Sequence, residues 1–370
     1  MKIAIVGGGI AGLAVGWRLA AAGADVDVLE RGLAGSGSTW AAAGMLAPAA
    51  EASHGNDPHA RLAREAREQW PSFARELEEA SGIAIGFDVC GSLTVACDDE
   101  RAAELSERGN FIRAYGEHAE YLSAETALAG EPMLARDIQG ALFAADDAKV
   151  DNRVVMEALV RAFARAGGHL HENCNVCSVH VEADRAKGVI TSDGTIAADC
   201  VIVAAGAWSS LLGGLADGTL PPIRPAKGQM VSLRVPQGAA MPRHLTWGDG
   251  IYVVSRGQVV LLGATVEDRG FDTSVTREAR DQLLARATRI LPALGTWSVA
   301  ESWAGLRPRT PDANPVLGVT GVGGLYMATG QFRNGILFAP VVAEILCKLV
   351  LGQGAGELAS SFDPRRFAKA

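Results

Sequence analysis

With 370 residues, 48% of them hydrophobic and 21% charged, the chain has the size and composition of a globular protein of two domains. Its 42 acidic and 34 basic residues give a net charge of −8, which disfavours a nucleic-acid partner and leaves any anionic substrate to be bound by local arginines. We expect a cytoplasmic protein, because no signal peptide precedes the first predicted strand and no apolar stretch reaches the roughly 18 residues of a membrane span.

The first thirty residues contain a complete nucleotide-binding pattern. Lys2–Val6 is an apolar, β-branched run typical of a buried parallel strand, and Gly7–Gly12 follows it with the spacing G-x-G-x-x-G. Leu13–Ala22 has apolar residues at helical spacing, and Val26–Glu30 is predicted as a second strand that ends in an acid. Strand, glycines, helix and second strand therefore stand in the order of one βαβ unit.

Each glycine of this motif has a physical task. Gly7 permits the tight turn, Gly9 lets a pyrophosphate approach the backbone, and Gly12 lets the helix pack on the strand. Free N–H groups at the helix start face the phosphates, and Glu30 is placed to accept hydrogen bonds from a ribose. Glu30 argues against a 2′-phosphate on the cofactor, although Arg31 adjoins it. The pattern predicts a bound dinucleotide, and the alternative for the glycines alone is an ordinary turn.

The rest of the chain alternates helical and extended patterns. Asp57–Ser81 and Asn152–Ala166 are predicted as helices, the first bent or divided at Pro71. Asp199–Gly206 is a buried strand that runs into glycine, whereas residues 229–265 have the alternation of an antiparallel sheet. We predict an α/β fold in which a Rossmann-like domain is interleaved with a smaller α+β substrate domain on a mainly antiparallel sheet. The first comprises residues 1–85, 140–222 and 300–370, and the second residues 86–139 and 223–299.

The six cysteines include one C-x-x-C pair, Cys174 and Cys177, a spacing that can serve metal or redox chemistry. The alternation around this pair is that of a strand, and no second pair stands at ligand spacing. We therefore interpret the cysteines as reduced, buried thiols.

Several polar residues in the second half of the chain are candidates for a site. Arg307 directly follows an extended run, and Gly324–Ile336 repeats the order strand, glycine, helix, with the helix expected to start near Asn334. Taken alone, Arg307 is either a substrate ligand or an ion pair between domains, and Arg333 either borders a site or caps carbonyls. Tyr252 on a strand is by default a core aromatic residue.

Five stretches of the sequence together resemble one protein family. They are the first thirty residues and the segments Ser38–Leu46, Gly206–Ser209, Trp303–Pro308 and Phe332–Leu337. The resemblance is to the D-amino-acid oxidase and sarcosine oxidase family of FAD-dependent oxidoreductases, in particular to its glycine oxidase branch in thiamine biosynthesis. It implies an FAD-binding Rossmann domain and the oxidation of a small amino acid to its imine, with electrons passed to O2 to give H2O2.

The resemblance also implies roles for particular residues. Arg307 resembles the arginine that pairs with the substrate carboxylate, Tyr252 its hydroxyl partner, and Arg333 the edge of the site near the flavin. The positions that resemble FAD contacts are Gly7, Gly9, Gly12, Glu30, Arg31, Ser38, Thr39, Ala42, Gly44, Met45, Val176, Gly206, Trp208, Arg333, Gly335 and Ile336. Non-covalent FAD is expected, because Gly305 stands where covalent relatives carry cysteine and Cys347 lies too late in the chain.

Three positions depart from the pattern of this branch. Gln331 stands where His is frequent, Val266 where Met is expected, and Gly250 where a His precedes the tyrosine. These differences concern the shape of the pocket and the exact amine, and they leave FAD binding untouched. Two other functions stay open: a dehydrogenase for D-amino or N-methyl amino acids that reduces a carrier, and a non-catalytic flavoprotein subunit. The sequence does not decide whether the chain forms a homo-oligomer.

Overall fold

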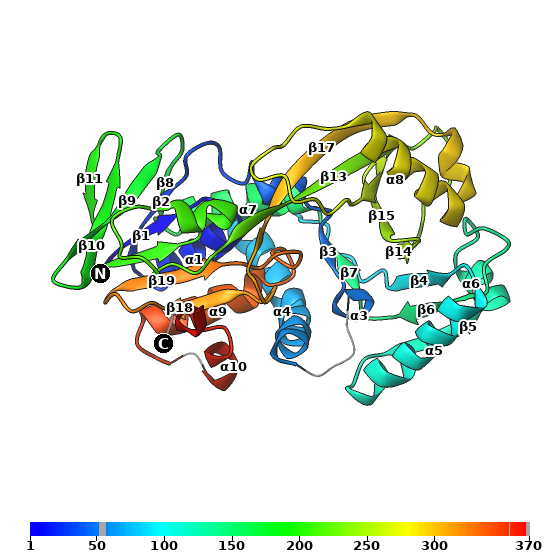
Figure 1. Cartoon of the computed structure of the whole chain (residues 1–370), viewed down its shortest axis with the longest axis horizontal. Helices are drawn as coiled ribbons and strands as arrows, with labels where there is room; N and C mark the ends of the chain where they lie inside the picture. Colours follow the sequence, from blue (N-terminus) through cyan, green and yellow to red (C-terminus); the bar gives the residue numbers. More distant parts are fainter. Residues whose placement is uncertain (52–56, 355, 368–370) are drawn as a thin grey trace.

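The computed structural model describes residues 1–51, 57–354 and 356–367, and its two large sheets lie side by side (Figure 1). The first sheet has six strands in the order β18-β19-β12-β1-β2-β8 and is parallel except for the β18–β19 pair. In chain order they are β1 (Lys2–Val6), β2 (Asp25–Leu29), β8 (His169–His171), β12 (Cys200–Val203), β18 (Val316–Val319) and β19 (Leu325–Thr329). Because β1 and β12 are neighbours at the centre, the loops that follow them lie together at one edge.

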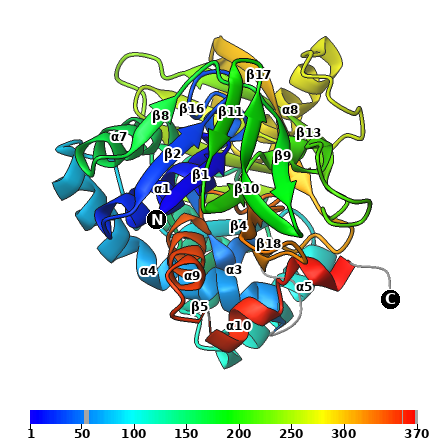
Figure 2. The same ribbon diagram turned by 90° about the vertical axis from the view of Figure 1, so that its left-hand side faces the viewer.

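Helices and a small sheet cover the two faces of this six-stranded sheet. One face carries α1 (Ile10–Ala21), α4 (Pro58–Ser81), α7 (Asn152–Arg165) and α9 (Ala339–Val350), which share a core with the sheet. The other face is covered by three antiparallel strands (Figure 2), namely β9 (Val176–Glu182), β10 (Arg185–Thr191) and β11 (Gly194–Ala197). Burial of each large apolar side chain in these layers stabilises the fold by about 1.5–3 kcal/mol.

The second sheet has eight strands in the order β17-β13-β16-β15-β14-β4-β6-β5, all antiparallel except for the β14–β4 pair. Its strands are β4 (Ser92–Ala96), β5 (Ala119–Ser123), β6 (Gly140–Ala144), β13 (Arg224–Arg234), β14 (Leu245–Gly248), β15 (Ile251–Arg256), β16 (Val259–Gly263) and β17 (Val299–Arg309). Helix α8 (Arg277–Ile290) packs on β13 to β16, whereas α5 (Asp99–Ala114) and α6 (Ala124–Gly130) pack on β5 and β6.

Short elements connect the two sheets. The long strands β13 and β17 run toward the first sheet (Figure 1) and contact η1 (Gly206–Leu211), and β17 also contacts α2 (Ser38–Ala41). After α2 the chain forms β3 (Met45–Leu46), which pairs with β7 (Ala148–Lys149), and then α3 (Pro48–Glu51). The remaining elements are η2 (Pro292–Thr296), α10 (Gly356–Ser360) and η3 (Pro364–Phe367).

The predicted fold class is confirmed, since a mainly parallel sheet with helices is interleaved with a mainly antiparallel one. The domain boundaries stay a prediction. All six strands of the first sheet fall within the residues assigned to the Rossmann-like domain. However, β6 and nearly all of β17 lie just beyond the predicted boundaries at 140 and 300, although they pair in the second sheet. We therefore propose that the substrate domain extends to Ala144 and to Arg309.

Three local predictions need correction. Helix α4 is not divided at Pro71: it is continuous from Pro58 to Ser81, with Pro71 on its exposed side and Trp70 and Phe73 on its buried side. The last long helix, α9, starts at Ala339 instead of near Asn334, since residues 335–338 form turns before it and Pro340 occupies its first turn. All six cysteines are free, as predicted, but only Cys200 is buried; Cys177 is exposed and the other four are partly exposed. Among the described residues, no helix combines the length and the apolar character needed to cross a membrane.

Candidate active site

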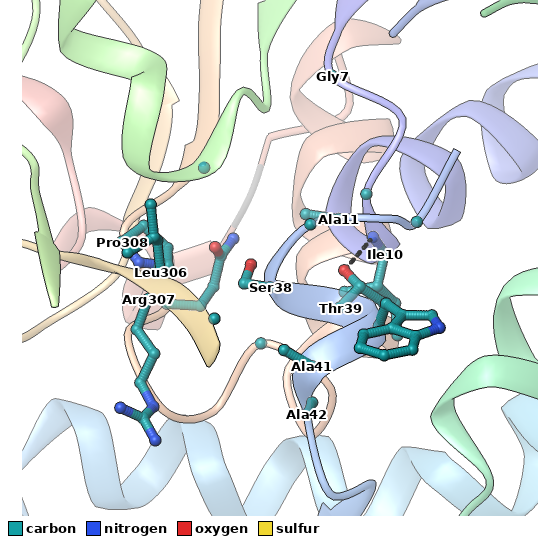
Figure 3. Close-up of a pocket in the computed structure, with 18 of the residues that line it drawn as sticks. Gly7, Ile10, Ala11, Ser38, Thr39, Ala41, Ala42, Leu306, Arg307 and Pro308 are labelled. Atoms are coloured by element: carbon teal, nitrogen blue, oxygen red, sulfur yellow. Dashed lines mark hydrogen bonds between the residues drawn. The ribbon is translucent and has the colours of Figure 1, made fainter. Parts of the chain in front are cut away.

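A cavity of about 840 Å³ lies between the loops that follow β1 and β12 and the end of β17. Figure 3 shows Ser38 and Thr39 of α2 on one side of this cavity and Leu306 and Arg307 of β17 on the other. A second cavity of about 870 Å³ adjoins the first at the substrate domain. The residues that line both are Met45, Glu51, Tyr252, Arg307, Phe332, Arg333 and Asn334. The two cavities therefore meet at these side chains.

The glycine-rich turn forms one end of the first cavity, and two of its glycines cannot be replaced without a clash. Gly7 has a φ of +110°, and a Cβ there would lie 2.5 Å from the carbonyl oxygen of Ala204. A Cβ on Gly12 would lie 2.0 Å from the carbonyl oxygen of Gly7, so Gly12 packs beneath the turn and does not line the cavity. The start of α1 is thereby held against the cavity, where its N–H groups suit a phosphate.

Residues from later in the chain complete this end. The Thr39 Oγ1 accepts a hydrogen bond of 3.1 Å from the Ile10 backbone N–H, the bond drawn in Figure 3, and so fixes α2 against the start of α1. The Glu30 carboxylate lines the cavity and accepts hydrogen bonds from the backbone N–H groups of Gly8 (2.8 Å) and Gly32 (3.0 Å). Its predicted role at a ribose stays a prediction. The Arg31 guanidinium stacks 3.6 Å from the centre of the Trp208 ring, at the same rim.

The structure brings the other predicted FAD contacts to the same cavity. Its lining includes Gly9, Ser38, Ala42, Gly44, Met45, Val176, Gly206, Gly335 and Ile336. These positions come from segments more than 300 residues apart in the sequence, and only the fold places them together. Their assignment as FAD contacts remains our proposal.

The residues present fit a bound flavin nucleotide. Gln331 lines the cavity, its side chain is 6% exposed, and its Nε2 has no hydrogen-bond partner among the described residues. A buried amide without a partner is costly, so this group requires a bound molecule or a shift to satisfy it. At Gly305, a Cβ would lie 2.5 Å from the Ala41 Cβ, which leaves no room for a cysteine side chain. The cavity therefore fits a non-covalently held group.

The substrate end is built around Arg307 on β17. Its Nη1 donates a hydrogen bond of 3.2 Å to the carbonyl oxygen of Thr265. The guanidinium lies over Gly228 of β13, where a Cβ would fall 2.2 Å from Nη1, so only glycine leaves room for it. Arg307 lines both cavities, and its other donors can bind an anion there.

Tyr252 on β15 is the second predicted residue at this end. Its hydroxyl donates to the Met230 Sδ at 3.1 Å. Burial raises the pKa of Tyr252, against the opposing charge of Arg307, so the phenol keeps its proton at neutral pH and remains a donor. Arg333, which follows β19, is exposed, and its guanidinium lies 5.3 Å from the centre of the Phe332 ring.

Glu51 is a residue of this site that the sequence analysis missed. It ends α3 and lines both cavities. Burial raises the pKa of its carboxyl, whereas the charges of Arg333 and Arg307 act to lower it. A signal was available, because Glu51 is the first charged residue after Arg31 in a long run of small and apolar residues. An acid in such a stretch, directly after a predicted flavin contact, is a candidate for the site.

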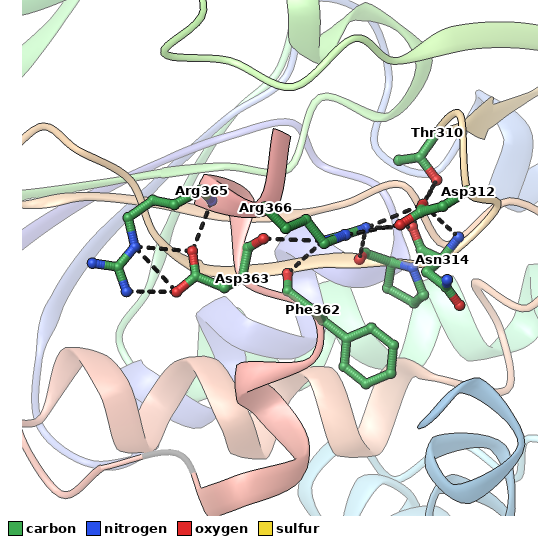
Figure 4. Close-up of polar contacts among 8 residues, drawn as sticks. Thr310, Asp312, Asn314, Phe362, Asp363, Arg365 and Arg366 are labelled. Carbon is green, nitrogen blue, oxygen red and sulfur yellow. Dashed lines mark hydrogen bonds and ion pairs between the residues drawn. The ribbon is translucent and has the colours of Figure 1, made fainter. Parts of the chain in front are cut away.

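The loop that follows Arg307 is held by the end of the chain. Figure 4 shows Arg366 of η3 between Asp312 and the backbone near Phe362. Its Nε donates to the Asp312 Oδ2 (2.9 Å), and its Nη2 donates to the carbonyl oxygen of Pro315 (2.8 Å). Burial acts to raise the pKa of Asp312, but hydrogen bonds, first of all from Arg366, outweigh it and hold that pKa below its usual value. These hydrogen bonds of Arg366 fix one rim of the second cavity.

The three positions that depart from the family pattern do not all line the same cavity. Gly250 and Val266 line the second cavity, with Val266 48% exposed, whereas Gln331 lines the first. Smaller side chains at the first two positions leave the second cavity open. Gly250 and Val266 therefore affect the shape of the second cavity, whereas Gln331 faces the first.

Comparisons with known proteins agree with this geometry. A family model described as FAD dependent oxidoreductase matches residues 2–349. Glycine oxidase of Geobacillus kaustophilus (strain HTA426) is 36% identical over 352 residues, which cover 94% of this chain and 92% of that protein. The crystal structure of glycine oxidase from Geobacillus kaustophilus has a TM-score of 0.92 to this chain at 35% identity, with 99% of both chains covered.

A second kind of relative is longer than this chain. The bifunctional protein ThiO/ThiG of Synechocystis sp. (strain ATCC 27184 / PCC 6803 / Kazusa) is 34% identical over 373 residues. The match covers 99% of this chain but 54% of that protein, so the chain spans about half the length of this bifunctional relative. The resemblance seen in the sequence is thus confirmed over nearly the whole chain.

Proposed function

The chain belongs to the family of FAD dependent oxidoreductases, and from this premise we propose that it oxidises glycine, or a similar small amino acid, to the imine. Water then hydrolyses the imine to the 2-oxo acid and ammonia, and O2 is the electron acceptor. One observation supports this proposal above the others. Arg307, Tyr252 and Glu51 meet where the two cavities join, at the opposite end from the glycine-rich turn.

Arg307 binds the substrate carboxylate. A planar guanidinium can donate two parallel hydrogen bonds to a carboxylate, which fixes both the position and the orientation of a small substrate. The buried, protonated Tyr252 hydroxyl can add a third donor, because the opposing charge of Arg307 does not cancel the effect of burial on its pKa. These two residues hold the carbon that bears the amino group at a fixed place relative to the first cavity.

Glu51 binds the amino group. Among the described residues that line both cavities, Glu51 carries the only carboxylate, and burial raises its pKa. A positively charged amino group beside it compensates that burial, and the carboxylate oxygens can accept its N–H groups or its proton. The substrate is then held at both charged ends, as a molecule of the size of glycine requires.

FAD supplies the redox chemistry, since when bound it accepts a hydride, which is two electrons and one proton, from the substrate carbon and passes the two electrons to O2. The protein's own residues bind, orient and exclude water. We propose that FAD is held without a covalent bond, that Arg333 borders the site, and that the predicted FAD contacts act as assigned above. Cytoplasmic location stays a prediction, and whether the chain forms a homo-oligomer stays open.

The place of the reaction in metabolism is also proposed. The bifunctional ThiO/ThiG relatives and the glycine oxidase relatives support a role in thiamine thiazole synthesis. Because the chain spans about half of the bifunctional relative, only the activity of the matching half is proposed here.

A reduction experiment tests the proposal. The purified protein is expected to show a yellow flavin spectrum that bleaches when glycine, sarcosine or D-alanine is added without oxygen. Readmission of air is expected to restore the colour and to give one H2O2 for each amine oxidised.

Each other outcome points to a different function. Bleaching without recovery in air, but with recovery on addition of an electron carrier, would favour the dehydrogenase. A flavin that no amine reduces would contradict the proposal and favour a non-catalytic subunit.

A further inference from the structure

Helix α3, which carries Glu51, is held by a buried carboxylate on one side. Asp147, which directly precedes β7, is fully buried. Its Oδ1 accepts a hydrogen bond from the Ala49 N–H (3.3 Å), and its Oδ2 accepts one from the Ala50 N–H (3.1 Å). The Ser92 hydroxyl on β4 donates to the same Oδ2 at 2.6 Å. Asp147 therefore ties the start of α3 to the first residue of β4 in the second sheet.

A buried guanidinium holds the same two residues from the other side. The Nη2 of Arg108, on α5, donates to the carbonyl oxygens of Ala49 (2.7 Å) and Ala50. The side chain is 9% exposed, and its Nε has no hydrogen-bond partner among the described residues. The two carbonyls thus fix the orientation of this guanidinium. Both residues that precede Glu51 have their N–H and C=O groups bound by charged side chains.

Burying these two charged side chains costs free energy of desolvation, and a turn with a purely structural role does not need them. Buried charges are retained where they are paired and hydrogen-bonded, and replacing them by apolar residues often costs nothing in stability. A helix of four residues cannot hold its own geometry, because nucleation of a helical turn is unfavourable. Asp147 and Arg108 supply from outside the order that α3 lacks.

We propose that Asp147 and Arg108 are positioning residues that fix Glu51 beside Arg307, so that the site binds the amino group and the carboxylate of one substrate together. The inference rests on the proposed function, because that reaction supplies a small substrate with two charged ends. Asp147 does not line either cavity, and Arg108 lines only the second, so they act through α3.

Two ligands separate a positioning role from a general structural one. Glycine carries an amino group and a carboxylate, whereas acetate carries only the carboxylate and therefore depends on Arg307 without using Glu51. Both are titrated into the FAD-loaded protein without oxygen at pH 8. Glycine binding is read from the concentration dependence of flavin bleaching, and acetate binding from the perturbation of the flavin spectrum.

In D147N and R108M, the apparent Kd for glycine is expected to rise at least tenfold, while that for acetate changes less than twofold. E51Q is expected to give the same pattern, and R108K to recover part of the glycine affinity, because its ammonium can still donate to one carbonyl. The matched controls are D146N, on the neighbouring residue, and R113M, on the same helix. The Asp146 side chain bonds to His118 and the Arg113 side chain to Asn110, so both variants are expected to bind glycine as the unchanged protein does.

Three results would overturn the inference. They are equal losses for glycine and acetate, unchanged glycine binding in both D147N and R108M, and the same loss in the controls. If D147N fails to fold or loses FAD, S92A serves in its place, with a smaller loss confined to glycine expected and an equal loss for acetate contradicting the inference. A native protein that no amino acid reduces would contradict the proposed function itself, whereas reduction with unchanged variants would remove only the positioning role.

Discussion

The two ends of the cavity are built from different parts of the polypeptide. At the nucleotide end, Gly7 and Gly9 lie in the turn after β1 and Gly12 in the first turn of α1, and the close packing of backbone atoms defines the shape of this end. At the substrate end, Glu51, Tyr252 and Arg307 come from α3, β15 and β17, where Tyr252 lies 201 positions after Glu51 and Arg307 another 55. The nucleotide end depends on glycines, which have no side chain. The substrate end depends on charged and polar side chains that distant elements bring together.

This difference determines how each end responds to change. A backbone site fails when added atoms move the main chain, and it should then lose affinity for the nucleotide. A site of charged side chains fails when one charge is removed and its partner stays buried, and it should then lose the substrate while the nucleotide stays bound. Variants at the two ends should therefore give opposite patterns of loss.

The largest effect is expected at Arg307. R307A removes the partner of the substrate carboxylate, so the rate of flavin reduction by glycine should fall about a thousandfold, which corresponds to about 4 kcal/mol. Bound FAD should be retained, because the nucleotide end keeps all its contacts. Anaerobic stopped-flow reduction and the flavin content of the purified protein measure the two quantities.

The matched control for this variant is R309A, two residues further along β17. Arg309 is exposed and lines neither cavity, so its removal should leave reduction by glycine within a few-fold of the native rate. Loss of FAD in R307A, or equal loss of rate in R309A, would contradict the role of Arg307 and the separation of the two ends.

The reverse pattern is expected at Gly12. The Cβ of G12A would lie 2.0 Å from the Gly7 carbonyl oxygen, a backbone atom that cannot turn aside, so α1 must move away from the turn. Overpacking of this kind costs about 1–3 kcal/mol, and we expect the Kd for FAD to rise by about a hundredfold at the upper end of that range. Fluorescence titration of the FAD-free protein measures it.

The control for the glycine variant is G321A. A Cβ at Gly321 meets nothing within 4 Å, so FAD affinity should not change there. Native FAD affinity in G12A would show that the turn has more freedom than its packing indicates.

The same difference explains what the sequence could predict. The βαβ unit follows from spacing within thirty residues, because each glycine acts on its immediate neighbours in the chain. The hydrogen bond from Ile10 to Thr39 and the stacking of Arg31 on Trp208 depend on loops meeting in space, and no local pattern encodes them. Arg307, Tyr252 and Arg333 were found through family resemblance, since spacing alone left their alternatives open.

Glu51 shows where local reasoning stops. An isolated acid in an apolar stretch is a candidate, but it belongs to no motif, and the hydrogen bonds that Asp147 and Arg108 make to the residues before it come from other elements. Pro71 shows the opposite limit, because a residue that disfavours helix interiors does not divide α4. Fold class and nucleotide end are thus accessible from local sequence, whereas the charges around α3 become visible only in three dimensions.

The buried charges at the substrate end should also make the stability depend on pH. Burial raises the pKa of Asp147 from 3.8 to about 7, against the hydrogen bonds from Ser92 and the N–H groups of α3 and the charge of Arg67. The folded state therefore binds more protons than the unfolded state between these values. The stabilisation is complete below the unfolded pKa and is lost as the pH rises toward 7.

D147N isolates this effect, because asparagine does not titrate. The free energy of unfolding of the native protein, relative to D147N, should fall by roughly 2–3 kcal/mol between pH 5 and pH 7. Urea unfolding at several pH values measures the difference. A difference that stays constant, or that grows as the pH rises, would show that the Asp147 carboxyl is already ionised at pH 5.

The smallest effect is expected at Gln331. It lines the nucleotide cavity, but like the residues of the substrate end it acts through its side chain. Its amide is buried without a partner among the described residues, and rotation about its last bond, a soft torsion, can present either its N–H groups or its oxygen to the cavity.

An N–H donor favours the electron-rich reduced flavin. Q331L should therefore make reduction about tenfold less favourable, which lowers the midpoint potential of a two-electron couple by about 30 mV. Q331H, which restores a donor, should recover most of this shift, and dye-coupled titration of the bound flavin measures all three proteins. A potential unchanged in Q331L, with FAD still bound, would place the amide away from the flavin and leave Gln331 without a role at the nucleotide end.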